Sequence, residues 1–314
     1  MTLSWGIAAT GRIAHDVGRV IAAQPGMRVA AVGSRDGGRA AALAAQLGAP
    51  VSCSSYAELV RAPGVDVVYV ATPHAVHAEV VELALAAGTP VLCEKPLTHS
   101  LAGTEALVRT AGAAGVFLME AMWMRFNPLV QQLAGLVRSG ALGEVRSVQA
   151  AFGFRAPYDP AHRLWDPALG GGALLDIGIY PVDLARLLLG SPDRLQVTGT
   201  LAPSGVDADV ALLLAWAGGA NGLLAASLTS VLPGVGTVSG SVATAELGPD
   251  FHAPTWLRVD GREVGRCDRR AGFVGELVEV GRCLAAGLVE SPVLPLADTV
   301  ATAELLHRAR QLIG

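Results

Sequence analysis

The sequence predicts an α/β domain with a doubly wound parallel sheet, followed by an α+β domain with a large, mostly antiparallel open sheet. Residues 3–120 alternate apolar strands with helical segments, which is typical of a parallel sheet covered by helices on both faces. Residues 195–264 instead hold short strands separated by turns rich in Gly, Pro, Asn and Asp. We expect the first domain at residues 1–121 and the second at residues 122–314, with the C-terminal helix able to pack back on the first.

The composition favours a globular protein of a reducing compartment. The 314 residues are 52% hydrophobic and 16% charged, which excludes a disordered chain. The net charge of −4 gives no reason to expect nucleic acid or an anionic membrane as partner. The four cysteines lack metal-site spacing, so we expect no metal, no disulfide framework and a cytoplasmic location. The sequence starts in a strand pattern with no basic or apolar leader segment before it, so we expect no signal peptide, and its apolar runs are too short to cross a bilayer.

The elements of the first domain follow from apolar runs and helical spacing. Strands are expected at Leu3–Ala8, Arg28–Gly33, Val67–Ala71, Pro90–Cys93 and Val116–Met119. Helices are expected at Ile13–Ala23, Gly38–Leu47, Tyr56–Arg61, Val76–Ala87 and Leu101–Ala114. Connections between parallel strands are right-handed, and ligands of such sheets bind outside the carboxyl ends of the strands.

The second domain mixes both element types. Helices are expected at Pro128–Ser139, Ala173–Leu189, Phe273–Ala286 and Leu296–Ile313, and a strand at Glu144–Phe154. Three consecutive glycines, Gly170 to Gly172, precede the second of these helices. An open sheet with one uncovered face usually finds a partner, so we expect a homodimer or homotetramer joined through this sheet.

The first strand leads into a turn typical of the Rossmann dinucleotide-binding fold. The segment Gly6–Ala14 reads GIAATGRIA. Gly6 is expected to permit the tight turn, Ala8 replaces the glycine that allows close approach to a pyrophosphate, and Gly11 is expected to let the helix pack on the strand. The pyrophosphate would lie at the helix N-terminus, unless this is a plain strand-to-helix turn. The expected cofactor-binding residues here are Gly6, Ala8, Thr10, Gly11, Arg12 and Ile13.

The tip of the second strand favours NADP over NAD. NAD-binding domains of this type carry an acidic residue there, which binds the ribose 2′-hydroxyl. In this chain the strand ends in Gly33-Ser34-Arg35. The Ser34 hydroxyl and the Arg35 guanidinium suit a 2′-phosphate. Asp36 follows and is expected to cap the next helix; if it reached the ribose instead, NAD would be used.

Two histidines follow the strand that ends at Ala71. They lie in Thr72-Pro73-His74 and at His77, and their position at a strand end predicts that all four residues line the cofactor crevice. Either histidine is chemically suited to act as a general base. We favour the alternative, in which they position cofactor or substrate at the start of a helix.

Lys95 is the only lysine of the chain, because the other 22 of the 23 Lys+Arg residues are arginine. Arginine does not exchange a proton near neutral pH, since its pKa lies above about 12. Lys95 follows a buried strand, in Glu94-Lys95-Pro96, which places it at the ligand edge. We predict that Lys95 acts in hydride transfer between an alcohol and nicotinamide and that Glu94 contacts the cofactor. The alternative is an ordinary surface lysine left by codon bias.

A matching cluster lies in the second domain, where Gly172–Asp183 reads GALLDIGIYPVD. Asp176 and Tyr180 are four residues apart and therefore share a helix face. A carboxylate beside a lysine holds it cationic, and the cation in turn favours tyrosinate, which is a usable base. Taken alone, Asp176 is better explained as a helix-start residue and Tyr180 as a core aromatic.

Together, these segments resemble the Gfo/Idh/MocA oxidoreductase family over essentially the whole chain. The resemblance rests on Gly6–Ala14, Ala71-Thr72-Pro73, Glu94-Lys95-Pro96 and Gly172–Asp183, in family order and spacing. Within the family, the segment 119–126, MEAMWMRF, is similar to dimeric dihydrodiol dehydrogenases and NADP-dependent D-xylose dehydrogenases.

The resemblance implies an NADP-dependent enzyme whose catalytic group is Lys95, Asp176 and Tyr180, with Tyr180 as general acid/base. It also implies a cis peptide between Lys95 and Pro96, an isomer whose cost proline lowers. Many relatives carry histidine where this chain has Tyr180, so whether Lys95 or Tyr180 carries the proton stays open.

Aromatic residues are concentrated around the predicted catalytic cluster. The chain has 5 Trp, 4 Tyr and 6 Phe, and eight of them fall within residues 117–180. Aromatic faces beside arginines suit a sugar or polyol. We predict only Trp123, Arg125, Phe154 and Trp165 as substrate residues; the alternative is that half of the eight aromatics simply form the domain interface.

Three functions fit these features. The first is an NADP-dependent dehydrogenase of a sugar, cyclic polyol or diol. The second is a keto-sugar reductase of secondary metabolism, with the same chemistry in the opposite direction. The third is a non-catalytic NADP-sensing regulator, which the retention of Lys95, Asp176 and Tyr180 disfavours.

Overall fold

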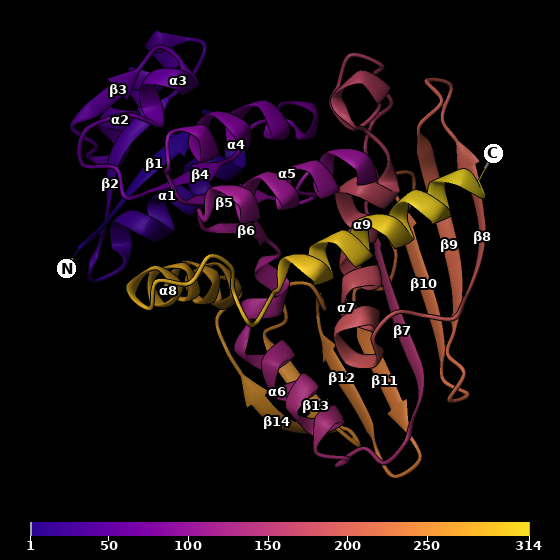
Figure 1. Ribbon diagram of the computed structural model, residues 1–314. Helices are drawn as coiled ribbons and strands as arrows, with labels where there is room; N and C mark the ends of the chain where they lie inside the picture. Colours follow the sequence, from indigo (N-terminus) through magenta and orange to yellow (C-terminus); the bar gives the residue numbers. More distant parts are fainter. Residues whose placement is uncertain (1, 314) are drawn as a thin grey trace. The chain divides into compact units, whose positions relative to one another are not determined.

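The computed structural model describes residues 2–313, which form two compact units (Figure 1). The first unit comprises the chain up to Met122 together with Phe273–Val300, and the second comprises Trp123–Gly272 and the chain from Ala301 on. The first unit is therefore completed by a segment that returns from the C-terminal part of the chain. Within residues 2–313, no helix is both long and apolar enough to span a membrane.

The first unit contains a six-stranded parallel sheet in the order β3-β2-β1-β4-β5-β6. The strands are β1 Leu3–Ala8, β2 Met27–Gly33, β3 Val51–Cys53, β4 Val67–Val70, β5 Val91–Glu94 and β6 Leu118–Ala121. The order reverses between β1 and β4, which confirms the doubly wound α/β fold. The sequence prediction missed β3, because three residues are too few to show a strand pattern.

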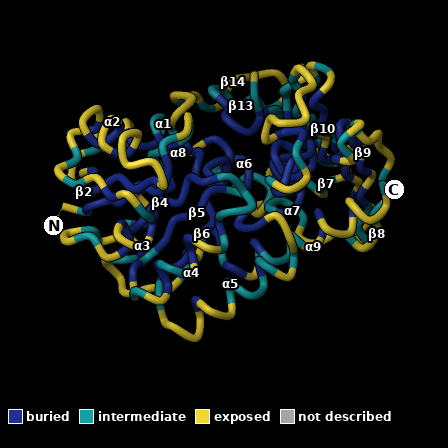
Figure 2. Tube along the Cα trace, turned by 90° about the horizontal axis from the view of Figure 1, so that it is seen from above, coloured by how far each residue is buried: buried dark blue, intermediate teal, exposed yellow. Residues whose placement is uncertain are grey.

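Helices connect these strands and enclose a buried core. They are α1 Arg12–Ala23, α2 Gly37–Leu47, α3 Tyr56–Leu59, the 3-10 helix η1 His74–Val76, α4 His77–Ala86, α5 Leu101–Ala114 and the returning α8 Ala271–Ala285. Every residue of β4, β5 and β6 is buried, and Figure 2 shows these central strands in dark blue. Burial on both faces explains the absence of polar alternation in these strands. The returning segment is joined to β6, where Leu118 N–H donates to the Val289 carbonyl (3.1 Å).

The second unit contains an eight-stranded mixed sheet in the order β14-β13-β12-β11-β7-β10-β9-β8. Its strands are β7 Val145–Gly153, β8 Arg194–Leu201, β9 Asp207–Ala215, β10 Asn221–Ser227, β11 Gly236–Gly240, β12 Thr244–Gly248, β13 Trp256–Val259 and β14 Arg262–Arg266. Only the β7–β10 pair is parallel, and the other pairs are antiparallel. The predicted large, mostly antiparallel sheet is thus confirmed.

Helices cover one face of this sheet (Figure 1). Those with the most extensive contacts to its strands are α6 Pro128–Arg138, the π-helix η4 Leu174–Gly178 and α7 Ile179–Leu189. This unit also contains the 3-10 helices η2 Trp123–Phe126 and η3 Pro167–Leu169, and α9 Leu296–Gln311 from Ala301 on. Along β9 and β10, buried and exposed residues alternate, as expected for strands with one covered face. The helix predicted at 173–189 is present, but its first part is the π-helix η4, which continues directly as α7.

The glycines of the first βα unit have other roles than the fingerprint suggests. A Cβ at Gly11 would meet no heavy atom of the described residues within 4 Å, so close packing does not require glycine there. A Cβ at Gly18 in α1 would lie 2.6 Å from Leu47 Cδ1 and 3.0 Å from Ile7 Cδ1. Gly18, and not Gly11, therefore lets α1 lie close to its neighbours.

We predict that Gly18→Val lowers the free energy of unfolding by about 1–3 kcal/mol, because the added methyl groups overpack this contact. The matched control is Gly112→Val in α5, where a Cβ meets no described atom within 4 Å; it should change stability by less than about 0.5 kcal/mol. Urea denaturation measures both values, and equal losses for the two variants would contradict the packing role of Gly18.

Candidate active site

Lys95 lies in a backbone segment that three neighbouring elements hold in place. The Lys95-Pro96 peptide is cis, as expected. Before it, the Tyr69 hydroxyl of β4 donates to Glu94 Oε1 (2.5 Å). After it, Leu97 N–H donates to Glu120 Oε1 of β6 (2.8 Å). The predicted catalytic lysine thus extends from a chain segment fixed by buried hydrogen bonds on either side.

His77 fastens the same segment to the end of β4. Its Nδ1 lies 2.9 Å from the Pro96 carbonyl oxygen and its Nε2 lies 2.8 Å from the Thr72 carbonyl oxygen. Burial lowers the pKa of His77, while the two carbonyls act in the opposite direction. With the ring fully buried and both nitrogens at backbone oxygens, the positioning role fits His77 and the general-base role does not. His74 is half-buried and packs edge-on against it.

The turn between β1 and α1 is suited to a phosphate group. Its left-handed residue is Ala9 (φ 110°) and not Gly6, which lies inside β1. Ala8 is fully buried in the core, so it offers only its backbone. No described side chain caps the first amides of α1, which leaves them for an anion.

The other residues predicted to contact the cofactor lie at the same strand ends. Thr10 is half-buried, Ile13 is in the first turn of α1, and Arg12 is exposed and pairs with Asp16 (3.7 Å). The Thr72 Oγ1 is buried and has no hydrogen-bond partner among residues 2–313. A buried, unsatisfied hydroxyl is costly, and a ligand group that pairs with it removes that cost. The residues present therefore fit a dinucleotide.

At the tip of β2, Asp36 caps α2, which confirms that prediction. Its Oδ1 accepts from Arg39 N–H (3.0 Å) and its Oδ2 from Arg39 Nε (3.0 Å), and this backbone hydrogen bond lowers the pKa of Asp36. Ser34 Oγ accepts from Asp36 N–H (3.1 Å), and Arg35 is exposed beside Tyr56. The carboxylate is committed to the helix, and two guanidinium groups lie at the tip.

In the second unit, Tyr180 has a defined hydrogen-bond partner. Trp123 Nε1 donates to the Tyr180 hydroxyl (2.9 Å), and both side chains are buried. An indole N–H only donates, so the phenol oxygen accepts here and its own proton is directed elsewhere. The His252 ring lies 5.2 Å from that of Tyr180 and 5.8 Å from that of Trp123, and stacks on Phe152 at 4.1 Å. Tyr180 is therefore held in an aromatic cluster.

Asp176 lies in the π-helix η4, one turn before Tyr180. Its Oδ1 accepts from Arg163 Nη1 (2.8 Å), and the Arg163 side chain is half-exposed. π-helical turns occur often at functional sites. The structure thus gives Asp176 an arginine partner within its own unit.

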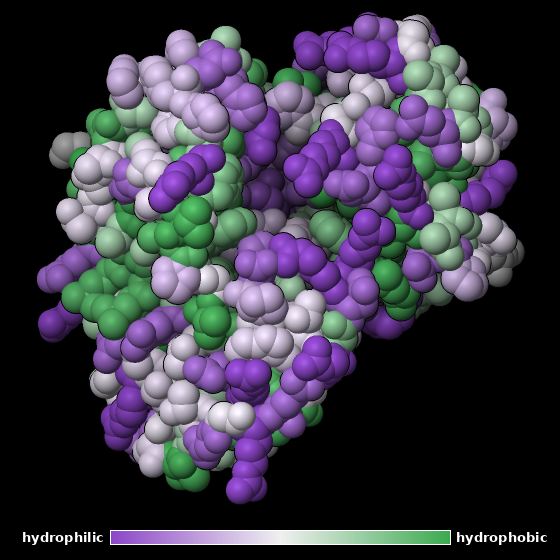
Figure 3. All heavy atoms as spheres, turned by 180° about the vertical axis from the view of Figure 1, so that it is seen from behind, coloured by the Kyte–Doolittle hydropathy of each residue, from purple (hydrophilic) through white to green (hydrophobic). Residues whose placement is uncertain are grey.

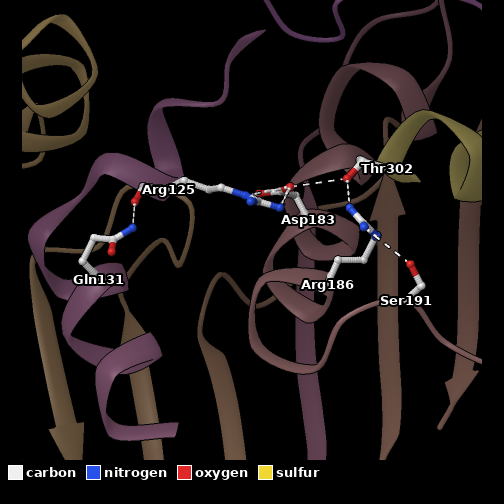
Figure 4. A network of polar contacts seen from close by, with 6 residues as sticks. All are labelled: Arg125, Gln131, Asp183, Arg186, Ser191 and Thr302. Atoms are coloured by element: carbon white, nitrogen blue, oxygen red, sulfur yellow. Dashed lines mark hydrogen bonds and ion pairs between the residues drawn. The ribbon is translucent and has the colours of Figure 1, made fainter. Parts of the chain in front are cut away.

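Arg125 is the centre of a buried polar network (Figure 4). Its Nε donates to Asp183 Oδ2 (2.9 Å) and its Nη2 to Asp183 Oδ1 (2.8 Å), and its exposed fraction is 1%. Thr302 donates to Asp183 (3.5 Å) and accepts from Arg186 (2.7 Å). The structure therefore gives Arg125 a structural partner in place of the exposed position that a substrate contact needs.

The remaining predicted substrate residues lie near this cluster. Trp165 is 2% exposed, and its Nε1 donates to the Pro157 carbonyl (2.9 Å). It belongs to a core cluster against which the half-buried Phe154 packs. Trp165 therefore supports this region from inside, and Phe154 and Trp123 are better placed for a ligand.

Two family profiles match the chain. The profile "Oxidoreductase family, NAD-binding Rossmann fold" matches residues 3–122, and the profile "GFO/IDH/MocA C-terminal domain" matches residues 130–246. The trans-1,2-dihydrobenzene-1,2-diol dehydrogenase of Mus musculus is 38% identical, with 100% of this chain and 98% of that protein covered. The human enzyme of that name is 37% identical over the same shares.

The chain belongs to the Gfo/Idh/MocA oxidoreductase family.

Two solved structures are similar to this chain over nearly its whole length. An aldose-aldose oxidoreductase from Caulobacter crescentus, complexed with glycerol, superposes with a TM-score of 0.89 at 28% identity, covering 99% of this chain and 98% of that one. A 3-ketoreductase from Actinomadura kijaniata, in complex with NADP and TDP-benzene, gives 0.87 at 26% identity, covering 100% and 98%. The protein is accordingly an NAD(P)-binding oxidoreductase that acts on CH–OH groups.

Several residues that surround the predicted site residues within each unit were not predicted from the sequence. They are Tyr69, Glu120, Arg39, Arg163, Asp183 and His252. Glu120 and Asp183 lie inside segments 119–126 and Gly172–Asp183, whose resemblance to the family could have drawn attention to both residues. His252 is separated from Tyr180 by 72 positions in sequence, and no local pattern marks it.

We predict that Asp183→Asn lowers the free energy of unfolding by about 3–5 kcal/mol, because it leaves the buried Arg125 charge without its counter-ion. Arg163→Gln breaks the ion pair between Arg163 and Asp176. Because the Arg163 side chain is 49% exposed, this variant should lower the free energy of unfolding by less than about 1 kcal/mol. Chemical denaturation compares the two variants. A loss for Asp183→Asn no larger than that for Arg163→Gln would contradict the structural importance of the buried pair.

Proposed function

We propose that this protein is an NADP-dependent enzyme that transfers hydride between nicotinamide and a sugar, cyclic polyol or related diol, interconverting an alcohol and a ketone. The observation that carries the proposal is the Trp123–Tyr180 hydrogen bond. A donor to the phenol oxygen favours the phenolate form, and a phenolate is a competent base for an alcohol proton. The names of the mouse and Caulobacter relatives, a diol and an aldose oxidoreductase, support the substrate class.

The roles follow from the chemistry of each side chain. When bound, the nicotinamide ring accepts or supplies the hydride. Tyr180 takes the hydroxyl proton of the substrate during oxidation and returns it during reduction. Lys95 supplies the positive charge that favours tyrosinate and a developing alkoxide. Asp176 is the anionic partner of this group, and its ion pair with Arg163 orients its carboxylate. Phe154 and Trp123 offer aromatic surface to the C–H face of a sugar.

A second candidate is reduction of a keto-sugar in secondary metabolism. The similarity to a 3-ketoreductase crystallised with NADP favours it. The chemistry is the same, and only the direction of hydride transfer differs.

The four cysteines are unpaired, which supports the expectation of a reducing, cytoplasmic compartment.

We further propose that a second copy of the chain covers the open face of the eight-stranded sheet. Figure 3 shows hydrophobic residues over this face. They line a shallow depression of about 680 Å³, in which Leu213 and Leu223 form a cross-strand pair with exposed fractions of 41% and 48%. Small side chains, Ala151, Ala211 and Ala225, lie beside this pair. A flat face of this kind suits a self-complementary contact in a homodimer or homotetramer.

We predict that Tyr180→Phe lowers kcat about 100-fold or more, because it removes the proton carrier, and that the Kd for NADPH stays unchanged. Lys95→Arg keeps the charge and removes the titratable amine. An NADP(H) absorbance screen across aldoses, inositols, keto-sugars and aromatic dihydrodiols identifies the substrate and its direction. Full turnover by Tyr180→Phe would refute its role, and full turnover by Lys95→Arg would show that Lys95 acts through charge alone.

The cofactor preference depends on Arg35 at the tip of β2. Arg35→Ser should lower kcat/KM for NADP about 10–100-fold, the value of one charge-assisted hydrogen bond, and should leave kcat/KM for NAD within about threefold. Arg19→Ser, an exposed arginine near the other end of α1, is the control and should alter neither. A wild-type kcat/KM for NAD above that for NADP would overturn the assignment.

The proposed interface predicts that Leu213→Glu combined with Leu223→Glu yields a monomer, because four buried charges per dimer have no partners. Light scattering then gives the 32.1 kDa of one chain in place of a multiple. Val242→Glu, at an exposed turn between β11 and β12, is the control and should keep the wild-type mass. An unchanged mass for the double variant would place any interface elsewhere.

A further inference from the structure

The glycine run before the catalytic helix is packed against a neighbouring loop. A Cβ at Gly171 would lie 2.7 Å from the Leu164 carbonyl oxygen and 2.9 Å from those of Arg163 and Asp166. Gly171 N–H donates to the Asp166 carbonyl (3.0 Å) and Gly172 N–H to the Leu164 carbonyl (2.9 Å). Only glycine allows three carbonyls this close. The loop so fixed carries Arg163, the partner of Asp176.

Gly172 makes room for a different group, the carboxylate of Asp207. Gly172 has a φ of +116°, and a Cβ there would lie 2.4 Å from Asp207 Oδ1. Asp207 is the first residue of β9 and is 4% exposed. Its Oδ2 accepts from the backbone N–H of Leu174 (2.6 Å), the first residue of η4. The residue at the Ncap position of η4 is Ala173, and its side chain makes no capping hydrogen bond.

We propose that Asp207 is a positioning residue for hydride transfer: from a strand, it caps the helix that carries Asp176 and Tyr180, and Gly172 exists to admit its carboxylate. This rests on the proposed roles of Asp176 and Tyr180. A negative charge at a helix N-terminus is favourable, and a carboxylate accepts more strongly than a neutral acid. Fixing the first turn of η4 fixes the direction of the two side chains that follow within six residues.

The charge of Asp207 also makes this contact sensitive to pH. Burial raises the pKa of Asp207 to about 6. The groups that act in the opposite direction are the backbone amides of Leu174 in η4, of the preceding Ala173 and of Asp207 itself, and the Arg310 guanidinium from α9. The carboxylate is therefore ionised, and caps most strongly, above about pH 6.

The test compares Asp207→Ala, which removes the acceptor, with Asp207→Asn, which keeps an acceptor oxygen without charge. In hydrogen–deuterium exchange at pH 7.5, residues 173–182 should exchange about tenfold faster in Asp207→Ala and by an intermediate factor in Asp207→Asn. The value of kcat should fall about tenfold or more in Asp207→Ala, with KM for the cofactor within about threefold. Asp209→Asn, whose carboxylate accepts from Thr200, Ser227 and Thr229, is the matched control and should change neither.

The pH profile supplies a second readout. Wild-type kcat should fall below about pH 6, and this fall should be absent in Asp207→Asn, which also serves if Asp207→Ala does not fold. Unchanged exchange in both variants would overturn the proposal. So would faster exchange with full activity, provided that Tyr180→Phe is inactive. If Tyr180→Phe is fully active as well, the proposed function fails, and the capping contact stands on the exchange data.

Discussion

The second unit depends on one buried ion pair. Arg125 and Asp183 are 58 positions apart in sequence, and each is almost completely removed from water. Desolvating two charges is costly unless their geometry is good and their remaining hydrogen bonds are satisfied. The bidentate contact and Thr302 meet that condition. The pair joins η2 to α7. Arg125 lies two residues after Trp123, and Asp183 lies three residues after Tyr180. The 2.9 Å contact between Trp123 and Tyr180 thus lies close in sequence, on both segments, to the buried ion pair.

Much of the fold could be predicted from the sequence, because the signals were local. Buried parallel strands need continuous apolar runs, and two helices of the first unit, α2 and α5, end where the chain has Gly48 and Gly115 in a left-handed conformation. The same reasoning could not find β3, which is a strand only because β2 lies beside it. The same reasoning could not distinguish the π-helix η4 from an α-helix, because a buried apolar segment has a similar sequence in either conformation.

The candidate site could be predicted only in part, and the reason is physical. Residue type marked Lys95, because the chain has a single lysine, whereas Asp176 and Tyr180 were marked by the resemblance to the family. Their surroundings are tertiary. Arg125 pairs with a residue 58 positions away, which no local pattern shows. Its neighbouring aromatics suggested a ligand-facing position, but its side chain is buried in this ion pair. Gly11 matches the fingerprint, yet the close contact of α1 belongs to Gly18, and Leu47 of a different helix decides that.

Three buried carboxyl groups show how this fold accommodates charge. Asp183 is paired with a guanidinium, Asp207 caps a helix, and Glu276 in α8 has no hydrogen-bond partner among residues 2–313. Burial, and after it the charge of Glu94, raises the pKa of Glu276 well above its usual value, which favours the neutral acid over the carboxylate. A raised pKa contributes stability that is complete at low pH and is lost as the pH rises through the folded-state value. Burial thus disfavours a second charge at Glu276 beside Glu94, which accepts the Tyr69 hydrogen bond that fixes the segment of Lys95.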